Sequence, residues 1–234
     1  MQRANSVSAY DTYLLCEGKG DKDFFTRFLE FHGFKSVVVE HANNGKDDIG
    51  KTLMGKYADS KMPLENFKNI IIVIDSDDDP SESFQAVVAQ LERVNLDRST
   101  GFSVASGEFP ISIPEDSWTK VLTAGSQPSV CVLSIPDRSR SGALETLCYD
   151  ALKNNGGNIT DCVEAFSHCC GADAWAEQKK SKLKLRAFLS ATHQRDPDIG
   201  FSRVFQVSPN LIDFNHEVFM PLKSFLTTIL EAEK

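Results

Sequence analysis

Four aspartates within residues 75–79 directly follow an aliphatic run, and they are the first candidates for chemistry in this chain. The run, residues 70–74, is short and rich in β-branched side chains, and Pro80 ends the segment. Such a run predicts a central strand that is buried on both faces. Asp75 and Asp77 are two positions apart, so in an extended chain their side chains share one face, about 7 Å apart at the Cα atoms. This spacing suits a hard divalent cation, and a solvated acidic turn is the alternative.

Carboxylates also follow the other predicted strands. Glu17 comes after an apolar run and precedes a Gly-Lys-Gly turn, Asp21 lies four positions later, and Glu40 follows the second run. Glu145 falls in the first turn of a predicted helix, shortly after a possible capping residue, Ser141. Because parallel strands end at one edge of a sheet, we expect these acids to converge. The alternatives are a helix cap at Asp21 and a favourable charge at a helix N-terminus for Glu145.

A basic segment, residues 179–186, holds five Lys or Arg side chains in eight positions. On composition alone it is a solvated helix face. Lys182, however, shares a helical stripe with Leu185 and Leu189, which directs it toward the body of the protein. Lys182 is therefore the preferred candidate for a phosphate contact, and Lys184 is the alternative.

Two arginines in the turn after the fourth predicted strand, Arg138 and Arg140, flank the acidic edge and are candidates for binding substrate phosphates. The five histidines are dispersed and form no motif with a serine or cysteine. The six cysteines show no C-x-x-C spacing, so we expect structural thiols and neither a nucleophilic triad nor a zinc site.

The elements that must position these residues alternate between strand and helix. Strands are predicted at residues 10–16, 37–39, 70–74 and 130–135. Helices are predicted at residues 22–33, 48–57, 81–91 and 142–153. This order predicts an α/β fold with a Rossmann-like parallel sheet flanked by helices.

The rest of the chain has a different character. Residues 101–127 predict irregular structure or a β-excursion, because Gly, Ser and Pro are frequent there. Additional C-terminal helices are predicted at residues 161–170, 174–191 and 216–230, with a loop between the last two at Pro197, Gly200 and Pro209. We expect an α/β core at residues 8–158 and a helical extension at residues 159–234, packed on the same domain.

Composition limits the function classes. The chain has 234 residues, 41% of them hydrophobic and 25% charged, which is ordinary for a folded soluble protein. A net charge of −8 argues against a protein that coats nucleic acid by bulk electrostatics. No apolar run is long enough to cross a bilayer and the N-terminus lacks a signal-peptide core, so we expect a cytoplasmic protein with no membrane partner.

Several of these motifs together resemble the TOPRIM domain, which topoisomerases, primases and nucleases of the OLD (overcoming lysogeny defect) type share. They are Glu17-Gly18 after a strand, Asp21, and Asp75-x-Asp77 at the end of a later strand. The stretch LSIPDRSRSGALETL, residues 133–147, and the basic segment KLKLRAFLS resemble the corresponding parts of stand-alone, OLD-like members. The resemblance extends from about residue 10 to the end of the chain.

The resemblance implies roles for individual residues. Glu17 would be a metal ligand or a general acid/base, and Asp75 and Asp77 would bind a first Mg²⁺ (or Mn²⁺). Asp21 and Glu145 would help to hold a second ion. A lysine of the late basic helix would stabilise charge on the scissile phosphate.

The implied activity is metal-dependent phosphoryl transfer, most simply two-metal hydrolysis of a phosphodiester in DNA or RNA. No G-x-x-x-x-G-K-[ST] segment is present, although full OLD nucleases carry an ATPase, so a separately encoded ATPase or other protein is an expected partner. The alternative is a non-catalytic, regulatory module that binds a metal-nucleotide or nucleic acid. A receiver-type domain fits less well because of the Glu-Gly turn and the C-terminal helices.

Overall fold

The computed structural model describes residues 10–59, 61–99, 111–121, 128–153 and 157–230. Within them, four parallel strands form one sheet in the order β2-β1-β3-β4. The strands are β1 (Thr12–Cys16), β2 (Val37–His41), β3 (Asn69–Asp75) and β4 (Ser129–Ile135). In the central pair, Thr12 is in register with Asn69 and Cys16 with Val73. The predicted Rossmann-like parallel sheet is confirmed.

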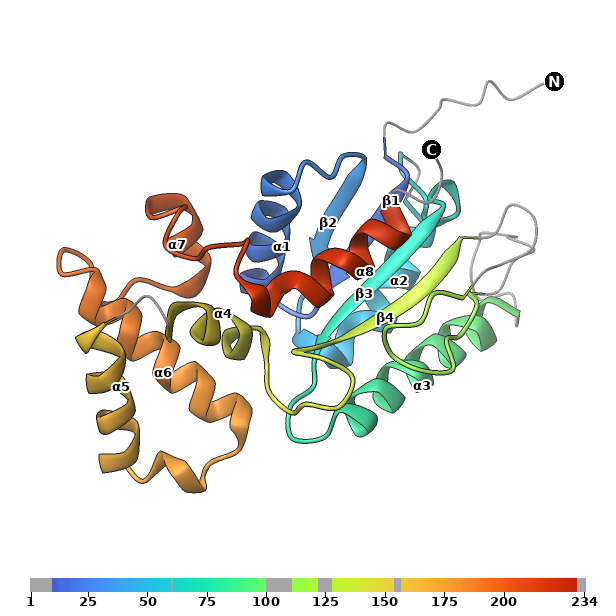
Figure 1. Ribbon diagram of the computed structural model, residues 1–234. Helices are drawn as coiled ribbons and strands as arrows, with labels where there is room; N and C mark the ends of the chain where they lie inside the picture. Colours follow the sequence, from blue (N-terminus) through green and yellow to red (C-terminus); the bar gives the residue numbers. More distant parts are fainter. Residues whose placement is uncertain (1–9, 60, 100–110, 122–127, 154–156, 231–234) are drawn as a thin grey trace.

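Helices cover both faces of the sheet. Neighbouring residues of a strand point to opposite faces, and in the buried strands both sets of side chains are mostly apolar and need a helical layer to cover them. Leu15 and Ile72 pack with α2 (Ile49–Tyr57) and α3 (Pro80–Ser99), whereas Leu14 and Ile71 pack with α1 (Lys19–Phe31) and α8 (Met220–Leu230). Figure 1 shows α8 lying across the face opposite α2 and α3. The strand β1 is therefore fully buried, and the sheet lies between two helical layers.

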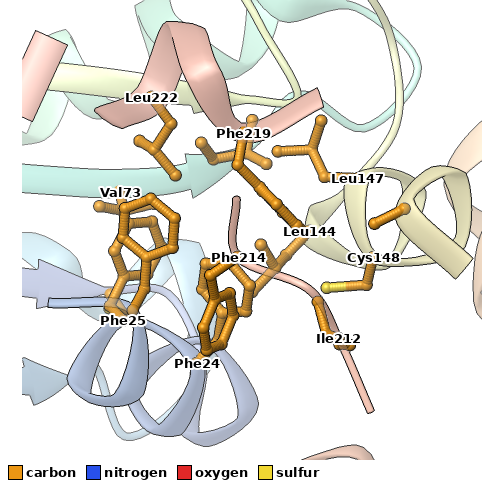
Figure 2. Packing of buried hydrophobic residues seen from close by; sticks show 14 of the residues in the cluster. Phe24, Phe25, Val73, Leu144, Leu147, Cys148, Ile212, Phe214, Phe219 and Leu222 are labelled. Atoms are coloured by element: carbon orange, nitrogen blue, oxygen red, sulfur yellow. The ribbon is translucent and has the colours of Figure 1, made fainter. Parts of the chain in front are cut away.

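An aromatic cluster joins α1 to the end of the chain. The ring of Phe24 lies within 6 Å of the rings of Phe205, Phe214 and Phe219, at centroid distances of 5.9, 5.5 and 5.7 Å. Figure 2 shows Phe24, Phe214 and Phe219 packed together with Leu144 of α4 (Leu144–Lys153). These contacts hold α1 and α4 in place. The first turn of α1 carries Asp21 and the first turn of α4 carries Glu145, two of the predicted site residues.

The remaining helices are α5 (Asn158–Cys169), α6 (Glu177–Thr192) and α7 (Phe201–Val207). Figure 1 shows α5 and α6 side by side, on the far side of α4 from the sheet. The predicted loop before α8 is wrong in part, because α7 lies within it. Its apolar residues Phe201, Val204 and Phe205 pack toward α1, but seven residues are too few for helical periodicity to be evident in the sequence.

Of residues 101–127, which were expected to be irregular or a β-excursion, only 111–121 lie within the described residues. This part contains no named helix or strand, and Val121 forms an isolated antiparallel bridge to Val130. Trp118 anchors it, since its Nε1 donates to the carbonyl oxygen of Ser134 at 2.8 Å. Short 3₁₀ turns complete the structure at Gly45–Asp48, Leu64–Asn66, Ala172–Ala174 and Glu217–Phe219. No helix in the described part of the chain combines the length and apolarity needed to span a membrane.

Candidate functional site

The strand order places a topological switch point between β1 and β3. From β1 the chain continues to β2 on one side, whereas β3 is followed by β4 on the other. Open α/β sheets bind ligands outside the carboxyl ends of such a strand pair. Glu17 directly follows β1, Asp75 is the last residue of β3, and the backbone N–H of Asp75 donates to Oε2 of Glu17 at 3.2 Å. Two predicted site residues therefore meet at the expected position.

Asp21 lies in the first turn of α1, where it hydrogen-bonds the backbone of the N-cap residue and joins the acidic group. Its Oδ2 accepts a hydrogen bond from the backbone N–H of Gly18 at 2.9 Å; Gly18 is the N-cap, so the alternative that Asp21 itself is the N-cap is wrong. Burial, together with the nearby carboxylates of Asp75 and Glu145, raises the pKa of Asp21 well above its usual value. Asp21 therefore supports the N-terminus of α1 from within its first turn and also belongs to the acidic group.

Glu145 approaches the same group from the first turn of α4. The preceding backbone N–H, that of Leu144, donates to Oδ1 of Asp75 at 3.0 Å, which ties this helix to the end of β3. Burial and the carboxylate of Asp75 raise the pKa of Glu145 to about 7. Its Oε2 is buried and has no hydrogen-bond partner among the described residues. An unpaired buried carboxylate oxygen is costly, which favours a ligand at this position.

Lys182 of α6 supplies positive charge to the acids. Its Nζ lies 3.5 Å from Oδ2 of Asp75, and Gln178, one helical turn earlier, also hydrogen-bonds Asp75. Burial opposes the charged form of Lys182, but the carboxylates of Glu145 and Asp75 outweigh it and raise the lysine pKa. The ammonium of Lys182 reaches the end of β3 as expected, but the side chain is 44% exposed, so the prediction that it points away from water is wrong in part; its contact with phosphate stays a prediction.

Asp77 has a different geometry from the one expected. The strand ends at Asp75, and Asp77 adopts a left-handed backbone with a φ of 51°. Its backbone exchanges two hydrogen bonds with Gly142, of 2.9 and 2.7 Å. Gly142 has a φ of 135°, and a Cβ atom there would lie 2.5 Å from Oγ1 of Thr146. The expectation that Asp75 and Asp77 share a face of an extended chain is therefore wrong.

The side chain of Asp77 instead pairs with Lys46, which the sequence reasoning did not select. Lys46 lies in the 3₁₀ turn after β2, and its Nζ donates to Oδ2 of Asp77 and to Oγ of Ser83, the latter at 3.0 Å. Its positive charge also lowers the pKa of Glu17, against the larger effect of burial. The signal in the sequence was a lysine immediately after the Asn-Asn-Gly turn, at the carboxyl end of a predicted strand.

The structure does not bring three other basic candidates into the acidic group. Lys184 pairs with Glu164 at 2.6 Å. Arg140 pairs with Asp150 at 2.6 Å. Arg138 donates to the carbonyl oxygen of Trp118 at 2.7 Å. Their roles in substrate binding stay predictions.

Glu40 also lies outside the acidic group. Its carboxylate accepts from the hydroxyl of Tyr13 at 2.8 Å and from Lys56 at 3.1 Å. The strand β2 continues one residue past Glu40, to His41, and the negative charge of Glu40 is already compensated by a buried lysine.

Burial and mutual repulsion dominate the electrostatics of the four acids that converge, Glu17, Asp21, Asp75 and Glu145. We call these four residues the carboxylate cluster. Burial, and next the charge of Asp75, raises the pKa of Glu17 to about 7, and burial raises that of Asp75 itself. A bound cation would stabilise the ionised form of these carboxylates and reduce their mutual repulsion.

The donor chemistry of the carboxylate cluster fits a hard divalent cation, since Mg²⁺ and Mn²⁺ prefer carboxylate oxygens. The unpartnered Oε2 of Glu145 is an available donor. As the side chains are placed, no group of three or more His, Cys, Asp or Glu residues in the described ranges is arranged to hold a metal ion. The ammonium of Lys182 lies against Asp75 instead and supplies positive charge there. The residue types therefore fit a metal. In the structure, the positive charge of Lys182 compensates part of the negative charge of the carboxylate cluster.

Residues 11–231 match the family model described as "Protein of unknown function (DUF3226)", and the chain belongs to this family. No curated protein and no solved structure matches the chain. The assignment of an activity therefore depends on the geometry of the site.

Proposed function

We propose that this protein is a metal-dependent phosphoryl-transfer enzyme, most simply a two-metal phosphodiester nuclease that acts on DNA or RNA. As part of this proposal, we infer that the protein is related to stand-alone, OLD-like TOPRIM proteins. The observation that carries it is the convergence of Glu17, Asp21, Asp75 and Glu145 at the β1–β3 switch point, with Lys182 beside them. Oxygen donors beside a cation are the parts that phosphoryl transfer requires.

The acids of the carboxylate cluster and Asp77 would hold Mg²⁺ or Mn²⁺. When bound, the metal would supply Lewis-acid activation of the phosphoryl group and of a water nucleophile. Lys182 would balance the negative charge that develops on the phosphoryl oxygens. Glu17, with a pKa of about 7, is suited to exchanging a proton near neutral pH. Asp21 would keep the N-terminus of α1 in place while contributing a carboxylate.

Two features favour the second candidate, a non-catalytic module that binds a metal-nucleotide or nucleic acid as a regulatory subunit. The described acids do not yet form a three-residue metal-holding arrangement. The net charge of −8 also disfavours unaided binding of a polyanion. A separately encoded ATPase or other protein partner would complete the assembly in either case. The six cysteines are free, which favours the reducing cytoplasm that we propose as its location.

Cleavage of supercoiled plasmid in Mg²⁺ and in Mn²⁺ tests the enzymatic proposal. We expect nicking or linearisation by the wild-type protein and its loss in Asp75→Ala and Glu17→Ala. Glu40→Gln is the matched control, since Glu40 also lies near the carboxyl end of a strand at this edge but pairs with Lys56. Activity that survives in both cluster variants would refute the site. A wild-type protein that binds metal and nucleic acid but cleaves nothing favours the regulatory module.

A further inference from the structure

Lys46 is placed at the carboxylate cluster by a well-anchored turn. It belongs to the 3₁₀ turn Gly45–Asp48 after β2, and its side chain is 18% exposed. The side chain of Gln90 on α3 fixes this turn, because its Nε2 donates to the carbonyl oxygen of Lys46 at 2.9 Å and its Oε1 accepts from the N–H of Gly50 at 2.8 Å. The anchored turn therefore directs the side chain of Lys46 toward the end of β3.

The ammonium of Lys46 lies between two oxygen acceptors. It donates to Oδ2 of Asp77 and to Oγ of Ser83, at 3.0 Å in the second case. Oγ of Ser83 in turn donates to the carbonyl oxygen of Ser76 at 3.0 Å, so the acceptor itself is oriented. Ser83 is buried and Asp77 is half-buried, which reduces solvent screening of the pair.

Two lysines from distant parts of the chain therefore occupy the two acids at the end of β3. Lys182 from α6 contacts Asp75, and Lys46 from the β2 side contacts Asp77. A divalent cation bound by Asp75 and Asp77 competes with both ammonium groups, because it needs the carboxylate oxygens that each of them contacts. An ammonium displaced from Asp77 remains tethered beside the site, where an anionic phosphate is its natural partner.

We propose that Lys46 is a second phosphate-binding residue of this site, which neutralises Asp77 in the metal-free protein and contacts the nucleic-acid backbone once a divalent cation binds Asp77. This inference rests on the proposed function, because it assumes a metal and a polyanionic substrate. It adds a contact on the β2 side of the carboxylate cluster, opposite the one expected from Lys182. Metal binding and substrate binding would then be coupled through one side chain.

The test measures two affinities of the variant Lys46→Met, one for Mn²⁺ and one for an oligonucleotide. The substitution keeps most of the side-chain volume and removes the charge. Mn²⁺ binding is measured by calorimetry at about pH 8, where carboxylates with a pKa near 7 are largely ionised. Binding of a single-stranded oligonucleotide is measured by fluorescence anisotropy with Ca²⁺, which replaces Mg²⁺ to suppress hydrolysis. Lys46→Arg keeps the charge. Lys51→Met is the matched control, since Lys51 lies nearby on α2 but its side chain is 82% exposed.

We expect Lys46→Met to bind Mn²⁺ about threefold to tenfold more tightly, because a competing cation is removed. The same variant should bind the oligonucleotide about tenfold more weakly, and its plot of log K against log salt should be shallower by about 0.7, as for one lost phosphate contact. Lys46→Arg should recover oligonucleotide binding, and Lys51→Met should behave as the wild type.

The outcomes that contradict the inference are distinct from those that contradict the proposed function. If Lys46→Met binds Mn²⁺ no more tightly, or binds the oligonucleotide with unchanged affinity and salt dependence, the inference is wrong while the site stands. If Lys46→Met binds both Mn²⁺ and the oligonucleotide more weakly, to the same degree, Lys46 has a structural role and the inference is also wrong. A wild-type protein that binds neither Mn²⁺ nor the oligonucleotide overturns the proposed function, and the inference with it.

Discussion

Replacing Glu17 by glutamine should stabilise the metal-free protein at alkaline pH, although the residue is central to the proposed site. Burial and the charge of Asp75 raise the pKa of Glu17 from 4.5 to about 7. The folded state therefore holds this proton more tightly than the unfolded chain. The associated stability is present below about pH 4.5, is lost as the pH rises to about 7, and stays lost above that.

The size of the effect follows from the pKa. A change from 4.5 to about 7 corresponds to about 3 kcal/mol at high pH. Screening by solvent and relaxation of neighbouring side chains reduce this to about 1–3 kcal/mol. For a chain of this length, each kcal/mol shifts Tm by about 2–4 °C. Glutamine keeps the shape and can still accept the hydrogen bond from Asp75 N–H, so only the charge is removed.

The assay is thermal unfolding in EDTA at about pH 8 and at about pH 5, where most of the penalty is absent. We expect a Tm increase of several degrees at the higher pH and little change at the lower one. Glu40→Gln is the control; it removes the negative charge that pairs with Lys56 and should not stabilise the protein. A Tm that falls at about pH 8, or a gain that does not depend on pH, would refute the electrostatic reasoning.

Three further outcomes are expected. Mg²⁺ should raise the Tm of the wild-type protein at about pH 8 and leave that of Asp75→Asn unchanged, by the mass-action effect of a ligand that binds only the folded state; an equal rise in both would place the metal elsewhere. Lys182→Met should lower turnover about 100-fold without weakening Mn²⁺ binding in calorimetry, and full turnover would exclude a role in charge stabilisation. Gly142→Ala should cost about 2–3 kcal/mol in urea unfolding, because of its positive φ and the close approach to Thr146, and a neutral variant would contradict the described turn.

The parts of this fold that could be predicted from sequence are those that local pattern specifies. The β-branched run of β3 and its sharp end at Asp75 identify a buried central strand. Once two such strands are parallel, Glu17 and Asp75 must meet at one edge, and a hydrogen bond joins them. The stripe that contains Lys182 likewise indicates that its ammonium reaches the sheet, although the side chain is 44% exposed.

What could not be predicted depends on contacts between distant segments. The turn at Asp77 is set by its pairing with Gly142, which belongs to the connection between β4 and α4. Lys46 is significant because Gln90 on another helix anchors its turn, and no local pattern reports this. Lys184 has the same residue type and nearly the same position as Lys182, but Glu164 on α5 determines its partner.

Calorimetric titration of the metal-free protein with Mn²⁺ at about pH 8 tests the central claim, that the carboxylate cluster is a divalent-cation site. The wild-type protein and Glu40→Gln should bind Mn²⁺ at this pH, because the acids whose pKa burial raises to about 7 are largely ionised there. Asp75→Asn should lose this binding, since Asp75 contacts or influences every other member of the group. Binding of equal strength in the wild type and Asp75→Asn, or none in the wild type, would contradict the claim.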